Sequence, residues 1–432
     1  MTADRSARLQ RPISQSILAL TVPVTLVSRG VVAALLAGAL ASPLLSGAAT
    51  AAAVGRTAAA APAQGPLLAW GLNEVGQLGT GDKSHYDSPV RVNVPFGLRA
   101  IGARSGNSSV AVNASGRAYT WGSGQDGQLG NGAFDNHLRP VQVRLPRRVK
   151  LRAAREGFAF VVALTTTGKA LTWGYGAQGQ LGNGHRANRN APVYVSVPRG
   201  VRVTAVSACG ACGIALTSDG RVLAWGDNSV GQLGNGKTGS TDVPVWVKLP
   251  KHTKVTSIAA GDGQLFAVTS TGGLLAWGSD NEGQLGNRHT GGLSRVPVRV
   301  HLPRGVKIAS VSSGMVQTLG LTTTGKVLAW GGNQSGQLGT GNKKNSNVPV
   351  YVHLPKIAHI VAIAAGRYHG LALTRGGKIL GWGDDSFGQL GDGGPGTKLT
   401  PVAVSVPGRK VLAIGAGPEA LDSMAVVDQI VD

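Results

Sequence analysis

Cysteine, acidic residues and aromatic residues are all scarce in this chain, and each scarcity removes a class of function. Two cysteines cannot supply a four-cysteine zinc site, and no histidine cluster replaces the missing pair. Acidic residues number 20 against 42 Lys and Arg, so the net charge is +22 and anionic partners are favoured. Aromatic residues make up 5% of the chain, which is few for stacking on bases, so nucleic acid is not an expected partner.

Long apolar runs are also rare, and the one that matters lies near the N-terminus, over residues 31–47. Arginines precede it and small residues follow it at 48–53, which is typical of a secretory signal peptide. The run is broken by Gly38 and Pro43 and is short for a membrane span. We expect a signal peptide over 1–53, an Ala-rich disordered tether over 54–66, and no membrane span after signal removal. The predicted location is secreted or extracellular, with association with the envelope of a bacterial cell left open.

What is abundant is a repeat of about 52 residues. Each copy has a Trp-Gly pair and, six residues after the Trp, the sequence Gly-Gln-Leu-Gly. The tryptophans, which we interpret as structural residues of the repeat, are Trp70, Trp121, Trp173, Trp225, Trp277, Trp330 and Trp382. Their spacing varies only between 51 and 53 residues, so the whole unit stays in register.

Each repeat is predicted to form four short strands. A segment such as "VTAVSA", one such as "IALT" and one such as "VLAW" are apolar, and the Gly of "TSDG" suits the turn between the last two. The fourth, "PVYVSVP" and its relatives, alternates apolar with polar residues and has a Pro at each end, so we expect a bounded edge strand. Four strands per unit without helical periodicity are typical of a propeller blade.

The order of the elements predicts how the ring closes. The repeats begin with only the last two strands of a unit and finish with only the first two, at "VLAIGAG" and "SMAVVD". The two chain ends should therefore share one blade, which leaves few free sheet edges. We predict an all-β, seven-bladed propeller of four-stranded antiparallel blades over residues 67–428. In it the Trp and Leu side chains pack between neighbouring sheets, and the glycines allow a backbone too close for a side chain.

Cys209 and Cys212 form a single C-x-x-C between two strand-like segments. A redox-active pair would be expected at the start of a helix, which this segment does not resemble. A local disulfide and two plain buried thiols both remain open for this pair.

The segment "HGLALTRGGKILGWGDDSFGQLGDG" at 369–393 and its six relatives resemble the repeats of the regulator of chromosome condensation family, the RCC1-like repeats. The resemblance implies a seven-bladed propeller. Known members include a chromatin-binding guanine-nucleotide exchange factor, ubiquitin-ligase and trafficking scaffolds, and a secreted inhibitor of β-lactamases. They share binding of macromolecules and no common reaction, so the resemblance implies a protein-binding function.

Two departures from those members matter. The exchange factor inserts a wedge from one blade, whereas these repeats vary too little in length to contain one. The secreted inhibitor has distinctly shorter repeats, so inhibition of a β-lactamase is kept only as an alternative function.

Two surfaces are candidates for binding. One is the loop between each Gly-Gln-Leu-Gly and the next Pro, which differs in every repeat and contains His85, His137, His185 and His289; these histidines form no predicted ligand set. The other is a basic annulus, predicted because basic residues recur after the outer strand at equivalent positions of successive repeats. Its members are Arg99, Arg147, Lys150, Arg199, Arg202, Lys251, Lys254, Arg304, Lys307 and Lys356. The alternative for the loops is neutral drift of a polar surface, and the alternative for the annulus is a merely solubilising rim.

No Ser-His-Asp order, paired-carboxylate motif or metal-ligand spacing is apparent, so we predict no enzyme activity, no cofactor and no metal. The predicted function is a secreted, monomeric, non-catalytic propeller that binds an unidentified protein. The alternative is electrostatic binding of an anionic cell-envelope polymer through the basic annulus.

Overall fold

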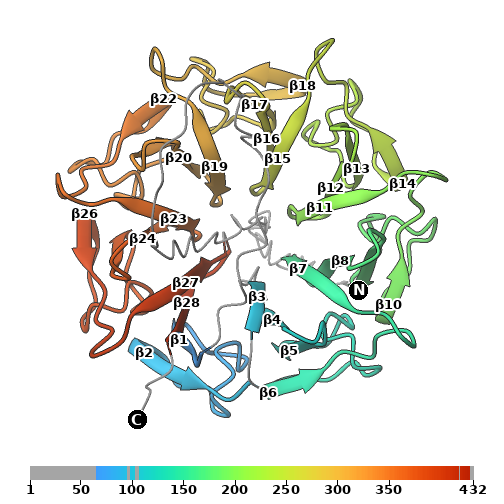
Figure 1. Cartoon of the computed structure of the whole chain (residues 1–432), viewed down its shortest axis with the longest axis horizontal. Helices are drawn as coiled ribbons and strands as arrows, with labels where there is room; N and C mark the ends of the chain where they lie inside the picture. Colours follow the sequence, from blue (N-terminus) through green and yellow to red (C-terminus); the bar gives the residue numbers. More distant parts are fainter. Residues whose placement is uncertain (1–64, 95–97, 103–106, 418, 429–432) are drawn as a thin grey trace, which may run out of the picture.

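The computed structural model describes residues 65–94, 98–102, 107–417 and 419–428, with side chains omitted for 99–102. The predicted signal peptide and most of the predicted tether therefore lie outside the described residues. In the described part, seven four-stranded antiparallel sheets surround a central axis as the blades of a propeller (Figure 1). This arrangement confirms the predicted fold. No helix in the described part is long and apolar enough to cross a membrane.

We number the blades 1 to 7 by their tryptophans in chain order. Blade 1 contains both ends of the described chain, because its strand order is β2-β1-β28-β27. Leu67 of β1 pairs with Val426 of β28, and Gly71 pairs with Asp422. The predicted closure of the ring by N- and C-terminal strands is thus confirmed, and Figure 1 shows these strands side by side at the lower left of the ring.

The inner strands lie closest to the axis and are rich in small residues, which suits the crowded centre of the ring (Figure 1). From blade 1 to blade 7 they are β27 (Val411–Ala416), β3 (Leu98–Gly102), β7 (Leu151–Gly157), β11 (Val203–Ala208), β15 (Val255–Ala260), β19 (Ile308–Ser313) and β23 (Ile360–Ala365).

The second and third strands are almost wholly buried, because both of their faces pack against neighbouring blades. The second strands are β28 (Asp422–Val427), β4 (Ser108–Asn113), β8 (Phe160–Thr165), β12 (Cys212–Thr217), β16 (Gln264–Thr269), β20 (Gln317–Thr322) and β24 (His369–Thr374). The third strands, each with its Trp, are β1 (Leu67–Gly71), β5 (Ala118–Gly122), β9 (Ala170–Gly174), β13 (Val222–Gly226), β17 (Leu274–Ser279), β21 (Val327–Gly331) and β25 (Ile379–Gly383).

The outer strands correct one prediction, since each begins three or four residues before the Pro that we expected to bound it. They are β2 (Tyr86–Val92), β6 (His137–Gln142), β10 (Arg189–Tyr194), β14 (Thr241–Trp246), β18 (Leu293–Arg299), β22 (Ser346–Tyr351) and β26 (Lys398–Ala403). In blade 2, His137 pairs with Gly122 of the third strand, and the register then shifts before Val141 pairs with Thr120. On an edge strand Pro140 can lie inside this irregular stretch, since its missing N–H faces no partner strand.

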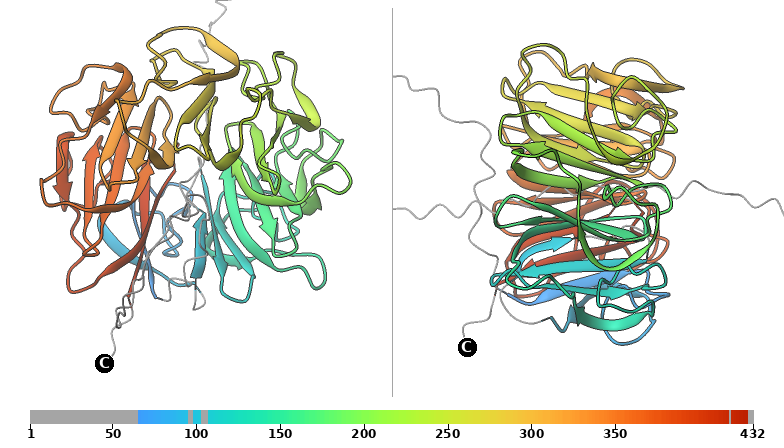
Figure 2. Two further views of the ribbon diagram at one scale, coloured as in Figure 1. Left: turned by 45° about the horizontal axis from the view of Figure 1, so that its top comes forward. Right: turned by 90° about the vertical axis from the view of Figure 1, so that its right-hand side faces the viewer.

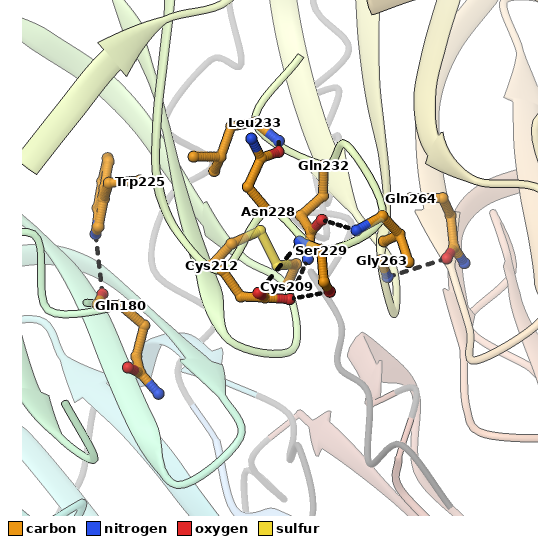
Figure 3. The surroundings of a disulfide bond; sticks show 12 residues. Gln180, Cys209, Cys212, Trp225, Asn228, Ser229, Gln232, Leu233, Gly263 and Gln264 are labelled. Atoms are coloured by element: carbon orange, nitrogen blue, oxygen red, sulfur yellow. Dashed lines mark hydrogen bonds between the residues drawn. A yellow bond between two sulfur atoms is a disulfide. The ribbon is translucent and has the colours of Figure 1, made fainter. Parts of the chain in front are cut away.

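The Gly-Gln-Leu-Gly sequence holds each blade to the next. The Trp225 indole N–H donates to the backbone oxygen of Gln180 in the preceding blade at 2.9 Å (Figure 3), and the equivalent bond is present at all seven junctions. The Gln180 side chain accepts from the Gln178 N–H at 3.0 Å and so organises its own loop. A Cβ added to Gly182 would lie 2.5 Å from the Trp225 ring, which explains why a glycine is required there.

Candidate binding face

The antiparallel order of the strands gives the ring two flat faces, seen edge-on in the right panel of Figure 2. The first, which we call the rim face, contains the hairpins between second and third strands and the connections from each outer strand to the next inner strand. The second, the loop face, contains the variable loops and the hairpins between inner and second strands.

The structure brings the predicted basic residues together on the rim face. The nine whose side chains are described are exposed and lie in the connections between blades: Arg147, Lys150, Arg199, Arg202, Lys251, Lys254, Arg304, Lys307 and Lys356. Arg99 lies in β3, and its side chain is outside the described residues.

Backbone hydrogen bonds hold these connections at the same place in successive blades. The Val203 N–H donates to Gly168 of the preceding blade at 3.0 Å, and the Ser218 N–H of the same blade donates to the Arg202 oxygen at 2.9 Å. A Cβ added to Gly168 would lie 2.7 Å from the Arg202 Cγ, so the stem of this arginine lies across the neighbouring hairpin. The basic side chains therefore project from fixed backbone positions.

A further group of cations on this face was missed by our sequence analysis. The residue between the hairpin glycine and the third strand is basic and exposed in five blades: Arg117, Lys169, Arg221, Lys326 and Lys378. The signal was present, since each follows the recurring glycine that precedes the Trp by five residues.

Three of these cations cover aromatic residues at the ends of the outer strands. The Arg221 Cζ lies 3.9 Å from the ring centroid of Trp246. The Lys169 ammonium lies 5.3 Å from the Tyr194 centroid, and that of Lys326 lies 5.5 Å from the Tyr351 centroid. Cation–π contacts of this kind fix the cation and shield the exposed edge of the blade.

Acidic residues are almost missing from the described part of the rim face, where Asp219 and Asp428 are the two that occur. Asp219 accepts from the Thr217 hydroxyl, which lowers its pKa to about 2, and it pairs with Arg221 at 2.7 Å. Asp428 accepts from the Lys410 N–H at 2.9 Å. The other described Asp and Glu lie in or next to the loops of the opposite face, so the rim face has one dominant sign of charge.

In five of the seven blades, the side chain three positions after the Trp organises the variable loop of the loop face. The Asn228 side chain accepts from the Leu233 N–H at 2.9 Å (Figure 3) and donates to the Lys237 oxygen at 2.9 Å. Asn73 and Asn333 make the corresponding bonds. Many of the hydrogen-bond donors and acceptors of these loops are therefore paired within the loop itself.

In blades 5 and 7 this position is occupied by an aspartate, Asp280 or Asp385. Burial raises the pKa of Asp280 to about 6 and that of Asp385 to about 7, in each case against a backbone N–H bond that lowers it. Asp392 lies near Asp385 and raises its pKa further. These are structural carboxyls whose neutral form resembles the asparagine of blades 1, 4 and 6.

The histidines of the variable loops are not brought together. His85 contacts Phe387 edge-on, with ring centroids 5.7 Å apart, and His137 lies 3.4 Å from Asp135. His185 and His289 are exposed in two further blades. Across the described residues no group of three or more His, Cys, Asp or Glu is placed to hold a metal ion.

One histidine–serine contact is of the kind that hydrolases use for nucleophilic catalysis. The His369 Nε2 lies 3.0 Å from the Ser423 Oγ, but both residues are fully buried between blades 7 and 1. Burial lowers the pKa of His369 to about 4, and the Ser423 hydroxyl donates to the Gln389 oxygen at 2.7 Å. Trp70 donates to the same oxygen, so this contact belongs to the junction of the two blades.

Cys209 and Cys212 form a disulfide in the hairpin between β11 and β12 of blade 4 (Figure 3). Both residues are buried, and the Cys209 N–H donates to the Cys212 oxygen at 2.8 Å. The pair lies on the loop face and takes no part in the basic annulus.

These features define the class of the molecule as a closed seven-bladed propeller with a cationic face. The family model of the RCC1-like domain matches residues 186–427, and that of the regulator of chromosome condensation (RCC1) repeat matches 64–112 and 115–164. The chain belongs to the RCC1-like family.

Two proteins of known name and one solved structure illustrate what this chain is similar to. The ultraviolet-B receptor UVR8 of Arabidopsis thaliana is 31% identical over 331 residues, covering 76% of this chain and 74% of the receptor. The mitochondrial RCC1 domain-containing protein RUG3 of the same plant is 31% identical over 78% of this chain and 82% of its own length. Among solved structures, Prp20p of Saccharomyces cerevisiae has a TM-score of 0.74 at 20% identity and covers 85% of this chain and 92% of its own. That likeness concerns the fold alone.

Proposed function

We propose that this protein is an exported, bacterial, non-catalytic propeller that holds an acidic protein partner against its rim face. The observation that carries the proposal is the segregation of charge. Fourteen exposed cations, the nine of the annulus and the five that directly precede third strands, share this face with two acidic residues that are already bonded. Cations held at fixed backbone positions favour a complementary anionic surface and speed its association.

A protein partner has precedent in the same fold, since Prp20p binds Gsp1p and histones. The loop face, the other candidate surface from the sequence, is a weaker candidate because its loops bond internally and its charges are mixed. An anionic cell-envelope polymer remains the second candidate, because the same rim face would attract it.

The test compares two variants of the full chain with the same change in net charge. The rim variant carries Arg147→Glu, Arg199→Glu, Lys251→Glu and Arg304→Glu. The control carries Lys83→Glu, Lys237→Glu, Lys343→Glu and Lys344→Glu, which change four exposed residues of the variable loops. Each protein is immobilised and exposed to secreted and envelope fractions of the producing cells at about 0.15 M salt.

We expect the wild type and the control to retain a protease-sensitive, acidic partner that the rim variant loses. Loss from the control alone would move the site to the loop face and contradict the proposal. Retention of only a protease-resistant, phosphate-containing polymer would contradict the protein partner and support the second candidate.

A further inference from the structure

Blade 5 departs from its neighbours on the rim face. The position after the hairpin glycine, which is basic in five other blades, is Gly273 here. The outer-strand position that holds Tyr194, Trp246 and Tyr351 in other blades is Arg299, which pairs with Leu275 of β17. Blade 5 therefore lacks both the cation that covers the outer strand and the ring that it would cover.

The missing side chain leaves a pocket of about 350 Å³ in this blade. Its floor is apolar, formed by Leu274, Leu275, Val300 and Leu302. Its walls contain hydroxyl groups, from Thr253, Thr269, Ser270 and Thr271. Its volume lies at the lower end of the range of about 300–1,000 Å³ that is typical of ligand pockets.

The charged residues that line the pocket are Lys254 and Arg299; His252 is also part of the lining, and no acidic residue is among the described residues that line it. The ion pairs of the described chain involve His137, Arg221 and Lys398, none of which lies here. Lys254 is held in place because its backbone oxygen accepts from the Ser270 N–H at 2.9 Å. The pocket thus combines an apolar floor with cations that have no counter-ion.

We propose that this blade 5 pocket anchors an acidic peptide segment of the partner. An apolar side chain of the segment lies on Leu274 and Val300, and carboxylates next to it pair with Lys254 and Arg299. A bare anion would leave the apolar floor unused, and a neutral apolar group would leave the cations unpaired; an apolar residue flanked by carboxylates satisfies both. The inference rests on the proposed function, because it names the point at which the acidic partner is held.

A substitution taken from the other repeats distinguishes anchoring in the pocket from diffuse electrostatic attraction to the rim face. Gly273→Lys restores the residue of blades 3, 6 and 7 and fills the pocket while it adds one positive charge to the rim face. A Cβ at this position meets only the hydroxyls of Thr269 and Thr271, at 3.2 and 3.8 Å, so the variant is expected to fold. Diffuse attraction would be strengthened by this change, whereas anchoring in the pocket would be lost.

A second variant, His252→Gly, removes one side chain that lines the pocket without a risk to folding. His252 has a φ of 60°, a left-handed conformation, and the equivalent residues Gly200 and Gly305 are glycines. Glycine adopts this conformation more readily, so the variant is expected to be at least as stable as the wild type.

The probes are two fluorescein-labelled hexapeptides, one with a central leucine flanked by glutamates and one with alanine in place of the leucine. Fluorescence polarisation with the full chain at about 0.15 M salt gives the dissociation constants. For the wild type we expect at least tenfold tighter binding of the leucine peptide. Gly273→Lys should weaken binding of the leucine peptide at least tenfold and leave binding of the alanine peptide unchanged or tighter. His252→Gly should weaken binding of the leucine peptide about threefold.

Three results would each overturn the proposal that the pocket anchors the peptide: equal binding of the two peptides, no binding of the leucine peptide, or tighter binding of the leucine peptide by Gly273→Lys. None of these results would overturn the proposed function, which is tested separately by the retention of an acidic protein partner on the wild type, the rim variant and the control. The two proposals can therefore fail separately.

Discussion

Blades 4 and 5 are adjacent copies of one repeat, and they differ at three places that serve different purposes. On the rim face, Arg221 covers Trp246 in blade 4, whereas Gly273 leaves Arg299 beside a pocket in blade 5. In the hairpin of the loop face, Cys209 and Cys212 are bonded, whereas Gln264 reaches Ser313 of the next blade at 3.0 Å. The buried loop residue is Asn228 in one blade and Asp280 in the other. The junction is the same in both, so the repeat preserves its scaffold while individual positions diverge.

The largest expected effect tests what the two blades share. Trp225→Ala and Trp277→Ala should each lower the free energy of unfolding by about 3–5 kcal/mol, because each leaves a cavity between blades and an unpaired Gln oxygen. Urea denaturation of the full chain measures this loss. A difference between the two variants of more than about 2 kcal/mol would contradict the equivalence of the junctions.

The disulfide is specific to blade 4. Changing Cys209 and Cys212 together to Ser should lower stability by about 2 kcal/mol, since the bond closes only a short loop. The Gly261 N–H bonds to the Gln264 oxygen in blade 5 without any disulfide, so the hairpin itself should persist. Thermal unfolding with and without reductant provides the measurement, and the serine variant should show no further response to reductant.

The buried loop residue gives a pH-dependent difference. The pKa of Asp280 is raised from 3.8 to about 6 in the folded protein, so the folded state binds the extra proton between these values and loses stability as the pH rises through that window. Asp280→Asn should stabilise the protein by about 1 kcal/mol at pH 8 and by little at pH 4. Asn228→Asp in blade 4 serves as the converse variant and should destabilise at pH 8. Equal stability of Asp280→Asn and wild type at both pH values would contradict the role of the buried charge.

The smallest effect concerns the rim face of blade 4. Arg221→Ala should cost about 1 kcal/mol or less, because it removes an exposed ion pair and a cation–π contact with Trp246. Denaturant unfolding at low and high salt would show part of this loss disappearing with salt. A loss above about 2 kcal/mol would indicate that the contact supports the packing of the blade.

The sequence by itself determined the number of blades, their four strands, the closure by both chain ends and the packing of the Trp residues between sheets. It could do so because these features depend on residues that recur at one spacing, and equivalent residues of a ring must occupy equivalent places. The basic annulus was predictable for the same reason. The start of the outer strands was misplaced because pairing with the third strand continues past a bulge, and that register is a property of two strands together.

Only the tertiary structure decided what the exceptions to the repeat mean. Gly273 and Arg299 lie 26 residues apart, and neither is unusual alone; the pocket exists because the hairpin, the outer strand and the connection from blade 4 meet there. The raised pKa of Asp280 depends on burial that no spacing reveals. A repeat can be recognised from its spacing along the chain. A site at a position where the repeat is interrupted depends on which side chains surround that position, and only packing in three dimensions determines these neighbours.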